Sequence, residues 1–501
     1  MKRDVKPGFL NPPNRPLKPA ADGWATAVLL TERWLARHDR VDTLLEGLTP
    51  GLPAQERARA QHLFYGVVRW SSRLELALTG LMSRPPRTKV RAVLLLAGFE
   101  ILEGGTPAQV IHHAVEQAKT VASPKEAGLI NAVARKMAGR LAEDMAQGPE
   151  EGAQGTKIRG KKTEELPSPG SVTASGVQGT EAGSQRAGDK RRKTDDSGQS
   201  TDDGAVAALA RRWAHPEWLV ARWVKQFGLE ATRQLLAWNQ QPAPVYARWR
   251  PASVAPAEGG PAAETIPPFL TPTRWPGFFE VKAGHWDEVR QLAQAGSLYL
   301  QDPSTRLCVE LLAPQPGETI LDACAAPGGK SLMIADAMKS GRIVALDEPG
   351  PRLVRLQENL NRAPAGVTIS LMPGDLKLAG AQYFAEYKLP DTYDAVLLDA
   401  PCSNTGVMRH RIDVKWRLQE GDFNQHAQQQ LALLHAAARL VRPGGRLVYS
   451  TCSLEAMENE NVLQAFFDSR AGGPFKLERQ ILAYPWVEGH DGAGAFLLRK
   501  S

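Results

Sequence analysis

The sequence predicts a multidomain protein with an N-terminal all-α domain, a small α/β middle domain and a C-terminal α/β doubly wound, Rossmann-like domain. Three observations carry this prediction. Apolar residues follow a helical period over the first 140 residues, a polar segment without aromatic residues comes next, and strand-like runs alternate with helical runs near the C-terminus. The length of 501 residues fits about three domains of roughly 150 residues each.

Residues 22–141 are expected to form the all-α domain. Apolar residues recur three and four positions apart in RWLARHDRVDTLLEGL, QHLFYGVVRWSSRLELALTGLM, VRAVLLLAGFEIL and AGLINAVARKMAGRL. Short Gly/Pro breaks separate these runs, and nothing alternates with period two. The pair His112 and His113 lies in a helical stretch, where a structural or solvated role is expected.

Residues 142–204 are expected to form a disordered, low-complexity linker. Gly, Ser, Thr, Gln and both signs of charge dominate this segment, which has no aromatic residue. Such a composition buries too little apolar surface to offset the entropy of ordering the chain. The basic run Lys190–Lys193 inside it is either a solvated charge run or an electrostatic contact to RNA.

Residues 205–296 are expected to form a helical connector followed by a small α/β domain that contacts RNA. Seven of the twelve tryptophans lie between Trp213 and Trp286. Tryptophans in such a stripe are usually core residues, and stacking on bases is the alternative. A proline-rich stretch with short β-like runs, such as PVYARWR, follows the helices.

Residues 297–501 are expected to form the doubly wound domain. The strand-like runs ETILDA, RIVALD, VTISL, YDAVLLDA and RLVYSTC are separated by helical or loop stretches, which is the pattern of a parallel sheet built from βαβ units. Ligands bind such sheets at the carboxyl ends of the strands.

The loop after the first of these strands reads CAAPGGKS and opens a helix-like run. A P-loop would need glycine at position 324, where the sequence has Cys324, and a G-x-G-x-x-G fingerprint is also absent. The second strand ends at Asp347, 18 residues after Gly329, close to the spacing at which an acid meets ribose hydroxyls. Asp375 follows the third strand, either as a ligand or as an ordinary turn aspartate. S-adenosylmethionine matches this anatomy, because it is a nucleoside without a phosphate.

Two cysteines stand at the ends of the fourth and fifth strands, Cys402 in DAPCS and Cys452 in STCS. In a doubly wound sheet both thiols are expected to face one crevice. Cys308 and Cys324 are expected to be small hydrophobic residues instead. The sequence has no C-x-x-C or Cys/His spacing, so we expect no metal.

A thiol near a methyl donor suits methylation of a pyrimidine carbon. Addition of a thiolate to C6 of cytosine makes C5 nucleophilic, and the thiol leaves after the C5 proton has been removed. The attacking cysteine should therefore have a lowered pKa. Asp399 is placed to accept the cytosine amino group, and the base must leave its stack to reach the thiol.

Composition excludes several classes of protein. With 61 Lys+Arg and 54 Asp+Glu, the net charge is +7, which permits a polyanionic partner without demanding one. The longest apolar run has 11 residues, and the first residues carry charges and prolines, so we expect neither a membrane span nor a signal peptide. Four cysteines cannot form a disulfide framework, which indicates a reducing, cytoplasmic location. We expect a monomer.

The motifs LDACAAPGGKS, LLDAPCSNTGVMRH and VYSTCS together resemble the RsmB (Sun/Fmu) type of 16S rRNA cytosine-C5 methyltransferase family. The resemblance runs from about Trp213 to the C-terminus. LFYGVVRW, LLLAGFEIL and GLINAVARKM are similar to helices of the NusB RNA-binding fold. The resemblance implies methyl transfer from S-adenosyl-L-methionine to C5 of a flipped cytosine, cytosine 967 in that family, in small-subunit ribosomal RNA through a covalent Cys–C6 adduct.

The resemblance also implies roles for individual residues. Asp347 would hold the ribose and Asp375 the adenine, and Asp399 would lie at the junction of cofactor and base. Because the cysteine of the later TC motif attacks in this family, Cys452 is the implied nucleophile and Cys402 is implied to assist product release. The cofactor would be wrapped by the run Cys324, Ala325, Ala326, Pro327, Gly328, Gly329 and Lys330.

Two departures and two alternatives accompany the resemblance. Where the family reads close to RRHPDIKW, this chain reads MRHRIDVKW over residues 408–416, with Ile412 in place of proline and the His/Arg order exchanged. The long segment 142–204 is the second departure. A tRNA cytosine-C5 methyltransferase would carry the same sheet and cysteines. The other alternative is a non-catalytic NusB-like RNA-binding factor, against which the cysteine pair and the ribose acid argue.

Overall fold

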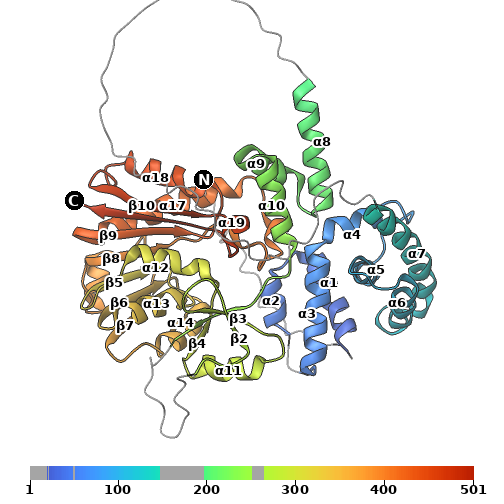
Figure 1. Cartoon of the computed structure of the whole chain (residues 1–501), viewed down its shortest axis with the longest axis horizontal. Coiled ribbons are helices and arrows are strands. Elements are labelled where there is room, and N and C mark those ends of the chain that lie inside the picture. The colour runs from blue at the N-terminus through green and yellow to red at the C-terminus, as the bar shows by residue number, and fades with distance from the viewer. Residues whose placement is uncertain (1–17, 19, 21, 49–50, 147–196, 251–264) are drawn as a thin grey trace, which may run out of the picture.

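The computed structural model describes residues 18, 20, 22–48, 51–146, 197–250 and 265–501. Figure 1 shows a helical unit, a group of connecting helices, a small sheet and a large sheet covered by helices. This architecture confirms the predicted fold class. None of the helices in the described ranges is long and apolar enough to cross a membrane.

The N-terminal unit is entirely helical in the part that the structure describes. It consists of α1 (Gly23–Arg37), α2 (Val41–Glu46), α3 (Ala54–Arg69), α4 (Ser71–Leu78), α5 (Thr88–Leu102), α6 (Pro107–Val121) and α7 (Pro124–Ala146). Helix α5 is buried on almost every side, and α1, α3, α4, α6 and α7 pack around it. Helix α3 comes so close to α5 that a Cβ on Gly66 would overlap the ring of Phe99.

Helices enter the expected linker, residues 142–204, from both ends. Helix α7 extends to Ala146, and α8 (Ser197–Arg212) begins at Ser197. The rest of that segment, with the basic run Lys190–Lys193, lies outside the described residues.

The connecting helices are α8, α9 (Glu217–Phe227) and α10 (Leu229–Gln240). A four-stranded antiparallel sheet of order β2-β3-β1-β4 follows. Its elements are β1 (Tyr246–Trp249), β2 (Leu270–Pro272), β3 (Phe278–Val281), α11 (Trp286–Gln294) and β4 (Leu298–Leu300). Strand β4 lies beyond residue 296, the expected end of the middle domain, because it pairs with β1. Trp223 is fully buried.

The large sheet has seven strands in the order β10-β11-β9-β8-β5-β6-β7. They are β5 (Thr319–Ala323), β6 (Gly341–Asp347), β7 (Val367–Pro373), β8 (Tyr393–Asp399), β9 (Val441–Thr451), β10 (Phe475–Ala483) and β11 (Ala493–Lys500). Strands β5 to β9 run parallel, as expected, and β10 and β11 add an antiparallel edge that the sequence pattern did not predict.

Helices cover both faces of this sheet, so its central strands are buried on both sides. One face carries α12 (Arg306–Leu312), α13 (Gly329–Met338) and α14 (Arg352–Leu360). The other carries α15 (Ala381–Glu386), α17 (Asp422–Arg439) and α18 (Glu460–Phe467). Two short helices, α16 (Val414–Arg417) and α19 (Pro485–Glu488), lie in loops. The carboxyl ends of β5, β6 and β8 are thereby held at one edge.

Candidate active site

A cavity of about 670 Å³ lies at the carboxyl ends of the parallel strands. The residues singled out in the sequence meet in its wall: Cys324, Ala325, Ala326, Pro327, Gly329, Lys330, Asp347, Asp375, Asp399, Cys402 and Cys452. Gly328 is the exception. Its backbone is left-handed, with φ of 102°, and a Cβ there would come within 3.0 Å of Leu356 on α14. Gly328 therefore serves the turn into α13 and does not line the cavity.

The loop between β5 and α13 is held against the end of β6. Asp347, which is 4 % exposed, accepts a hydrogen bond from the backbone N–H of Ala326 through Oδ2 at 2.8 Å. Its Oδ1 lies 3.6 Å from the guanidinium of Arg352. One oxygen of Asp347 therefore fixes the loop, and the other remains near the cavity, where a ribose hydroxyl could reach it. Asp375 accepts from the backbone N–H of Lys377 at 2.9 Å.

Asp322 is a further acid in this wall, and the sequence analysis missed it. It is fully buried near the end of β5, and its Oδ2 accepts from Ser331 Oγ at 2.5 Å. Its Oδ1 has no partner among the described residues. Burial raises the pKa of Asp322 to about 7. An acid within an apolar strand run, as in ETILDA, was the available signal, because an isolated buried carboxylate is costly without a role.

Lys330 and Asp399 form an ion pair across the cavity. Lys330 Nζ lies 2.5 Å from Asp399 Oδ2, and it comes from the first turn of α13, whereas Asp399 ends β8. Burial opposes the charge on Lys330, but Asp399 and neighbouring groups outweigh it and raise the pKa of the lysine. Lys330 therefore stays cationic and fixes the Asp399 carboxylate.

The donor set fits S-adenosylmethionine. Four carboxylates, those of Asp322, Asp347, Asp375 and Asp399, line one cavity beside a glycine turn. A nucleoside cofactor with a sulfonium and an ammonium group offers cations to acids and a diol to a strand-end carboxylate. The unpartnered, buried Oδ1 of Asp322 is the observation that most directly supports such a ligand.

Cys402 and Cys452 lie against each other in the same wall, with their Sγ atoms 3.1 Å apart. The hydrogen bond from Cys402 to Cys452, followed by burial, raises the pKa of Cys402. Cys402 therefore keeps its proton within hydrogen-bond distance of the sulfur of Cys452. Asn404 holds this arrangement, because its Oδ1 lies 3.4 Å from Cys452 Sγ and its Nδ2 donates to the Cys402 carbonyl at 2.7 Å.

One buried carboxylate holds the two cysteine loops together. Glu458 is fully buried and accepts from the backbone N–H of Ser403 at 2.9 Å and from Gln430 Nε2 at 3.1 Å. It also accepts short hydrogen bonds from the hydroxyls of Ser403 and Ser453. These serines directly follow Cys402 and Cys452, so Glu458 links the two cysteine loops. The sequence analysis missed this residue.

The other two cysteines behave as expected. Cys308 is 2 % exposed and lies within the apolar core under the sheet, and burial raises its pKa to about 12. Burial likewise raises the pKa of Cys324, whose backbone has a left-handed φ of 62° in the cofactor loop. Both thiols therefore stay protonated, which favours the packing role predicted for them.

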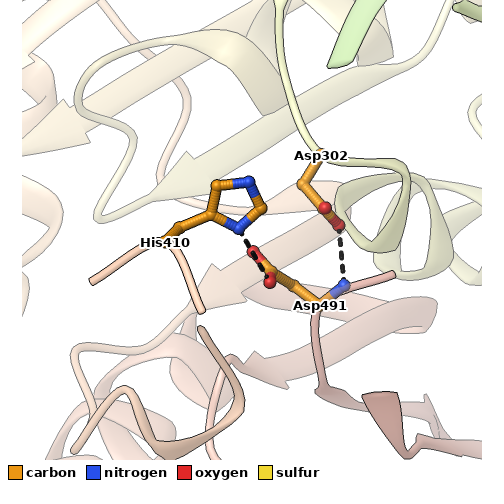
Figure 2. Close-up of side chains that lie close together, drawn as sticks. All are labelled: Asp302, His410 and Asp491. Atoms are coloured by element: carbon orange, nitrogen blue, oxygen red, sulfur yellow. Dashed lines mark hydrogen bonds and ion pairs between the residues drawn. The ribbon is translucent and has the colours of Figure 1, made fainter. Parts of the chain in front are cut away.

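A charged cluster closes the side of the cavity that faces the middle sheet. Figure 2 shows Asp302, His410 and Asp491 pointing toward one another. His410 Nδ1 lies 3.0 Å from Asp491 Oδ1, and its Nε2 lies 3.2 Å from the carbonyl of Pro244. Both partners accept, so the ring donates twice and is an imidazolium. Burial opposes this charge, but Asp491 and Asp302 raise the pKa of His410 to about 9.

Asp302 completes the cluster. Its Oδ1 accepts from the backbone N–H of Asp491 at 3.2 Å and from that of Ser304 at 2.8 Å, whereas Oδ2 is buried without a partner in the described residues. Burial and the nearby Asp491 raise the pKa of Asp302 to about 6. The three side chains have the donor types of a metal site, but both ring nitrogens of His410 are already used as donors.

The loop that carries Cys402 also meets the helical unit. We define the Cys402 loop as residues 400–417. Ile412, which stands where a proline was expected, is buried among side chains of α1, α2 and α3. Lys415 is 2 % exposed and donates to the carbonyl of Arg69 at 2.9 Å. Arg40 of the helical unit lines the cavity itself. No local sequence signal distinguishes Arg40 from other surface arginines.

Comparison with known proteins yields matches over both halves of the chain. The 16S rRNA methyltransferase RsmB/F family matches residues 309–479, and the NusB family matches residues 25–139. The ribosomal RNA small subunit methyltransferase B of Vibrio cholerae serotype O1 is 30% identical over 486 residues, which cover 90% of this chain and 93% of that protein. The protein of the same description from Cronobacter sakazakii is 29% identical over 449 residues, 87% of each chain.

A solved structure has a similar fold over nearly the whole chain. The crystal structure titled PH0851 superposes with a TM-score of 0.66 at 20% identity and covers 96% of this chain and 99% of that one. At this identity the likeness concerns the fold alone.

Proposed function

Because the chain belongs to the ribosomal RNA small subunit methyltransferase B family, we propose that it methylates C5 of a cytosine in small-subunit ribosomal RNA, with S-adenosyl-L-methionine as methyl donor. The family's site, cytosine 967, is the target that we propose. One observation carries the chemistry: two thiols with sulfur atoms 3.1 Å apart share a cavity with a loop and four carboxylates suited to a nucleoside cofactor.

In this proposal Cys452 is the nucleophile. Its thiolate forms a bond to C6 of the cytosine, and the electron pair of the C5–C6 double bond becomes available at C5. S-adenosylmethionine, when bound, supplies the methyl group that C5 takes. A base then removes the C5 proton, the double bond re-forms, and the S–C6 electron pair returns to Cys452. The thiolate leaves ready for another turnover.

Cys402 assists release of the product in this proposal. Its raised pKa keeps a proton on the thiol, and the 3.1 Å separation allows that proton to interact with the sulfur of Cys452 as the S–C6 bond breaks. Glu458 keeps the two loops at this separation through the serines that follow each cysteine. Its role is therefore to position the pair.

The ion pair of Lys330 and Asp399 would orient the base and the cofactor toward each other. Lys330 fixes the carboxylate, so Asp399 can accept the cytosine amino group with little reorganisation. We propose that Asp347 holds the ribose, Asp375 the adenine, and Asp322 a cationic group of the cofactor. The run from Cys324 to Lys330 would close around the cofactor.

Two other substrates or roles remain open. A tRNA substrate would use the same cysteines and cofactor loop, but the NusB match over residues 25–139 favours ribosomal RNA. A non-catalytic RNA-binding factor would have no use for the cysteine pair. All four cysteines are free thiols and none forms a disulfide bond, which supports a reducing, cytoplasmic location.

The decisive experiment measures transfer of labelled methyl from S-adenosylmethionine to unmethylated small-subunit ribosomal RNA and, separately, to total tRNA. Label in ribosomal RNA, located at C5 of cytosine by nucleoside analysis, is the expected result. Label in tRNA alone would overturn the proposed substrate and keep the chemistry. No label in either RNA, together with no binding of S-adenosylmethionine at millimolar concentration, would favour the non-catalytic role.

A further inference from the structure

A second cavity, of about 780 Å³, adjoins the proposed active cavity. Leu300, Gln301, Asp302, His410 and Asp491 line both of them. The charged cluster of Figure 2 therefore stands between the two spaces. The volume lies within the range of about 300–1,000 Å³ that is usual for sites of small ligands. Whatever fills the second cavity therefore lies next to the proposed active cavity.

All three parts of the chain contribute to this second cavity. Tyr65 and Arg69 come from the end of α3, Trp70 follows it, Arg73 comes from α4 and Phe99 from α5. Residues 242–246 lead into the small sheet, and residues 409–410 belong to the Cys402 loop. A site built from segments so far apart in sequence requires the native arrangement of the domains.

Two arginines of this wall have no acidic partner within the described ranges. Another cation of the wall is paired, since Arg73 lies 2.5 Å from Asp144. By contrast, Arg69 and Arg409 bond only to main-chain carbonyls. Their positive charges are therefore available to an anion.

The two arginines are also close neighbours. Arg69 Nη2 donates to the carbonyl of Arg409 at 3.4 Å, and the guanidinium of Arg409 lies 4.2 Å from the centre of the Trp238 ring. Burial, followed by the charge of Arg409, lowers the pKa of Arg69 to about 10. Two like charges that lack a directly bonded carboxylate gain from an anion between them, and a phosphate accepts from both forks.

Unpartnered polar atoms lie in the same wall. Gln240 is 6 % exposed and its Nε2 donates to the carbonyls of Arg69 and Trp213. This fixes the amide, and its Oε1 is left without a partner in the described part of the chain, as are Arg69 Nε and Asp302 Oδ2. Buried polar atoms are usually satisfied. The two acceptors and the one donor could therefore form hydrogen bonds with a polar ligand.

The remaining wall is aromatic and apolar. Tyr65, Trp70, Phe99 and Tyr246 supply ring surface, and Leu102, Val245 and Leu300 supply aliphatic surface. Bases stack on such rings, and stacking on aromatic side chains beside a cationic groove is the usual way in which proteins hold single-stranded nucleic acid.

We propose that this cavity holds the nucleotide next to the target cytosine, with its phosphate between Arg69 and Arg409, its base against the aromatic wall, and Gln240 Oε1 and Asp302 Oδ2 accepting from the base edge. The inference rests on the proposed function for its occupant, single-stranded RNA. A protein segment would satisfy the apolar wall but would leave the two arginines without an anion. The target base would then be drawn from the strand together with its neighbour.

The test compares RNA binding by Arg69→Gln with binding by Arg135→Gln, which removes the same charge from an exposed position of α7 outside the cavity. The probe is a fluorescent hairpin from small-subunit ribosomal RNA that contains the target cytosine. We expect Arg69→Gln to bind about tenfold more weakly. The slope of log affinity against log salt should fall by about 0.7, the loss of one phosphate contact to a single strand.

A second measurement does not depend on the folding of a variant. The wild-type chain is irradiated on a hairpin with 4-thiouridine beside the target cytosine, and the crosslinked peptide is sequenced. Crosslinks to the peptides with Tyr65, Trp70 or Tyr246 support the proposal. It is overturned if the crosslinks lie only outside the cavity, or if a folded Arg69→Gln variant binds like the control.

This outcome is independent of methyl transfer. Crosslinks in the cavity without any methylated cytosine would overturn the proposed reaction and leave the nucleotide site standing. Methylation at C5 with crosslinks only outside the cavity would overturn the nucleotide site and leave the proposed reaction standing.

Discussion

Trp416 of the Cys402 loop donates its indole N–H to the backbone carbonyl of Val68 at 2.7 Å, across 348 residues of sequence. Val68 lies in the last turn of α3, where carbonyls lack intrahelical partners. The loop that carries one of the two proposed reactive cysteines is thus tied to the end of a helix in the helical unit. Substitution of Trp416 should therefore affect methyl transfer.

We expect Trp416→Phe to lower the rate of methyl transfer about fivefold, which corresponds to the roughly 1 kcal/mol of one hydrogen bond. The smaller phenyl ring still packs against the helical unit, and the hydrogen bond to Val68 is lost. Because Trp416 does not line the cofactor cavity, affinity for S-adenosylmethionine should not change. Single-turnover rates and calorimetric titration measure the two effects. If the rate of methyl transfer and the affinity for S-adenosylmethionine fell equally, the fold as a whole would have been disturbed.

Cys452→Ser should abolish methyl transfer to RNA. A serine hydroxyl is far less acidic than a thiol and does not add to C6, whereas the cofactor loop is untouched. Transfer of labelled methyl measures the loss, and retained binding of S-adenosylmethionine shows that the variant is folded. Full activity in this variant would remove Cys452 from the role of nucleophile.

Cys402→Ala should leave the protein trapped on RNA as a covalent adduct. The nucleophile remains, but the thiol that assists release, 3.1 Å from Cys452 Sγ, is gone. A band of protein joined to labelled RNA should survive denaturing electrophoresis. The double variant Cys402→Ala/Cys452→Ser is the control and should give no such band. If the single variant also gives none, release does not depend on Cys402.

Glu458→Gln should destabilise the fold by about 1–3 kcal/mol, the cost of leaving buried donors unsatisfied. Both carboxylate oxygens of Glu458 accept hydrogen bonds. In the variant the amide N–H₂ replaces one of these oxygens and faces groups that donate to it in the wild-type chain. Glu460→Gln, two residues away and exposed, is the matched control. Urea unfolding measures the stability.

The same variant tests whether Glu458 positions the two cysteines. We expect the rates at which iodoacetamide alkylates Cys402 and Cys452 to change in Glu458→Gln, because the serines after both cysteines lose their acceptor. A loss of stability with unchanged alkylation rates would reduce Glu458 to a structural role.

Stability should depend on pH through His410. Its pKa is raised from 6.5 to about 9 in the folded chain, so the stabilisation is fully present below pH 6.5 and is lost as pH rises toward 9. His410→Gln should flatten this part of the profile. Urea unfolding of both proteins between pH 6 and pH 9.5 gives the comparison, and parallel profiles would contradict the assignment of an imidazolium.

Asp302 should make stability depend on pH over a second, lower pH range. Its pKa is raised from 3.8 to about 6, so the neutral acid is favoured in the fold, and the associated stability is lost as pH rises from about 4 to 6. Asp302→Asn keeps a neutral side chain at all pH values and should remove this slope. The two variants therefore separate the contributions of the cluster.

Local patterns in the sequence predicted the parallel sheet and the part of the cavity wall formed by the cofactor loop, the strand-end acids and the two cysteines. Strands buried on both faces read as continuous apolar runs, and the predicted site residues stand at strand ends or directly after them, where parallel topology collects ligands. The antiparallel edge was not predicted for a physical reason. Strand β10 exposes most of its residues and shows no clean alternation, and the pairing of β11 with β9 joins segments that are not neighbours along the chain.

Apart from Asp322, the missed site residues are those whose roles depend on long-range contacts. Asp302 and Asp491 are 189 residues apart, and Ser403 and Glu458 are 55 apart. Nothing local distinguishes Glu458 from the other acids of its neighbourhood, EAMENE. The end of the expected linker was missed for the same reason. Helix α8 packs its later residues against α9, and composition does not reveal that this packing stabilises a helix.

The contact between Lys415 and Arg69 bears on how such a protein can evolve. If a gene fusion replaced the helical unit by another RNA-binding module, Lys415 would lose the carbonyl that accepts its only side-chain hydrogen bond in the described structure, and it would be left as a nearly uncompensated buried amine. The cavity would also lose Arg40. The two units are therefore expected to be inherited together, and chimaeras between distant relatives should work only when the end of α3 and the Cys402 loop come from the same parent.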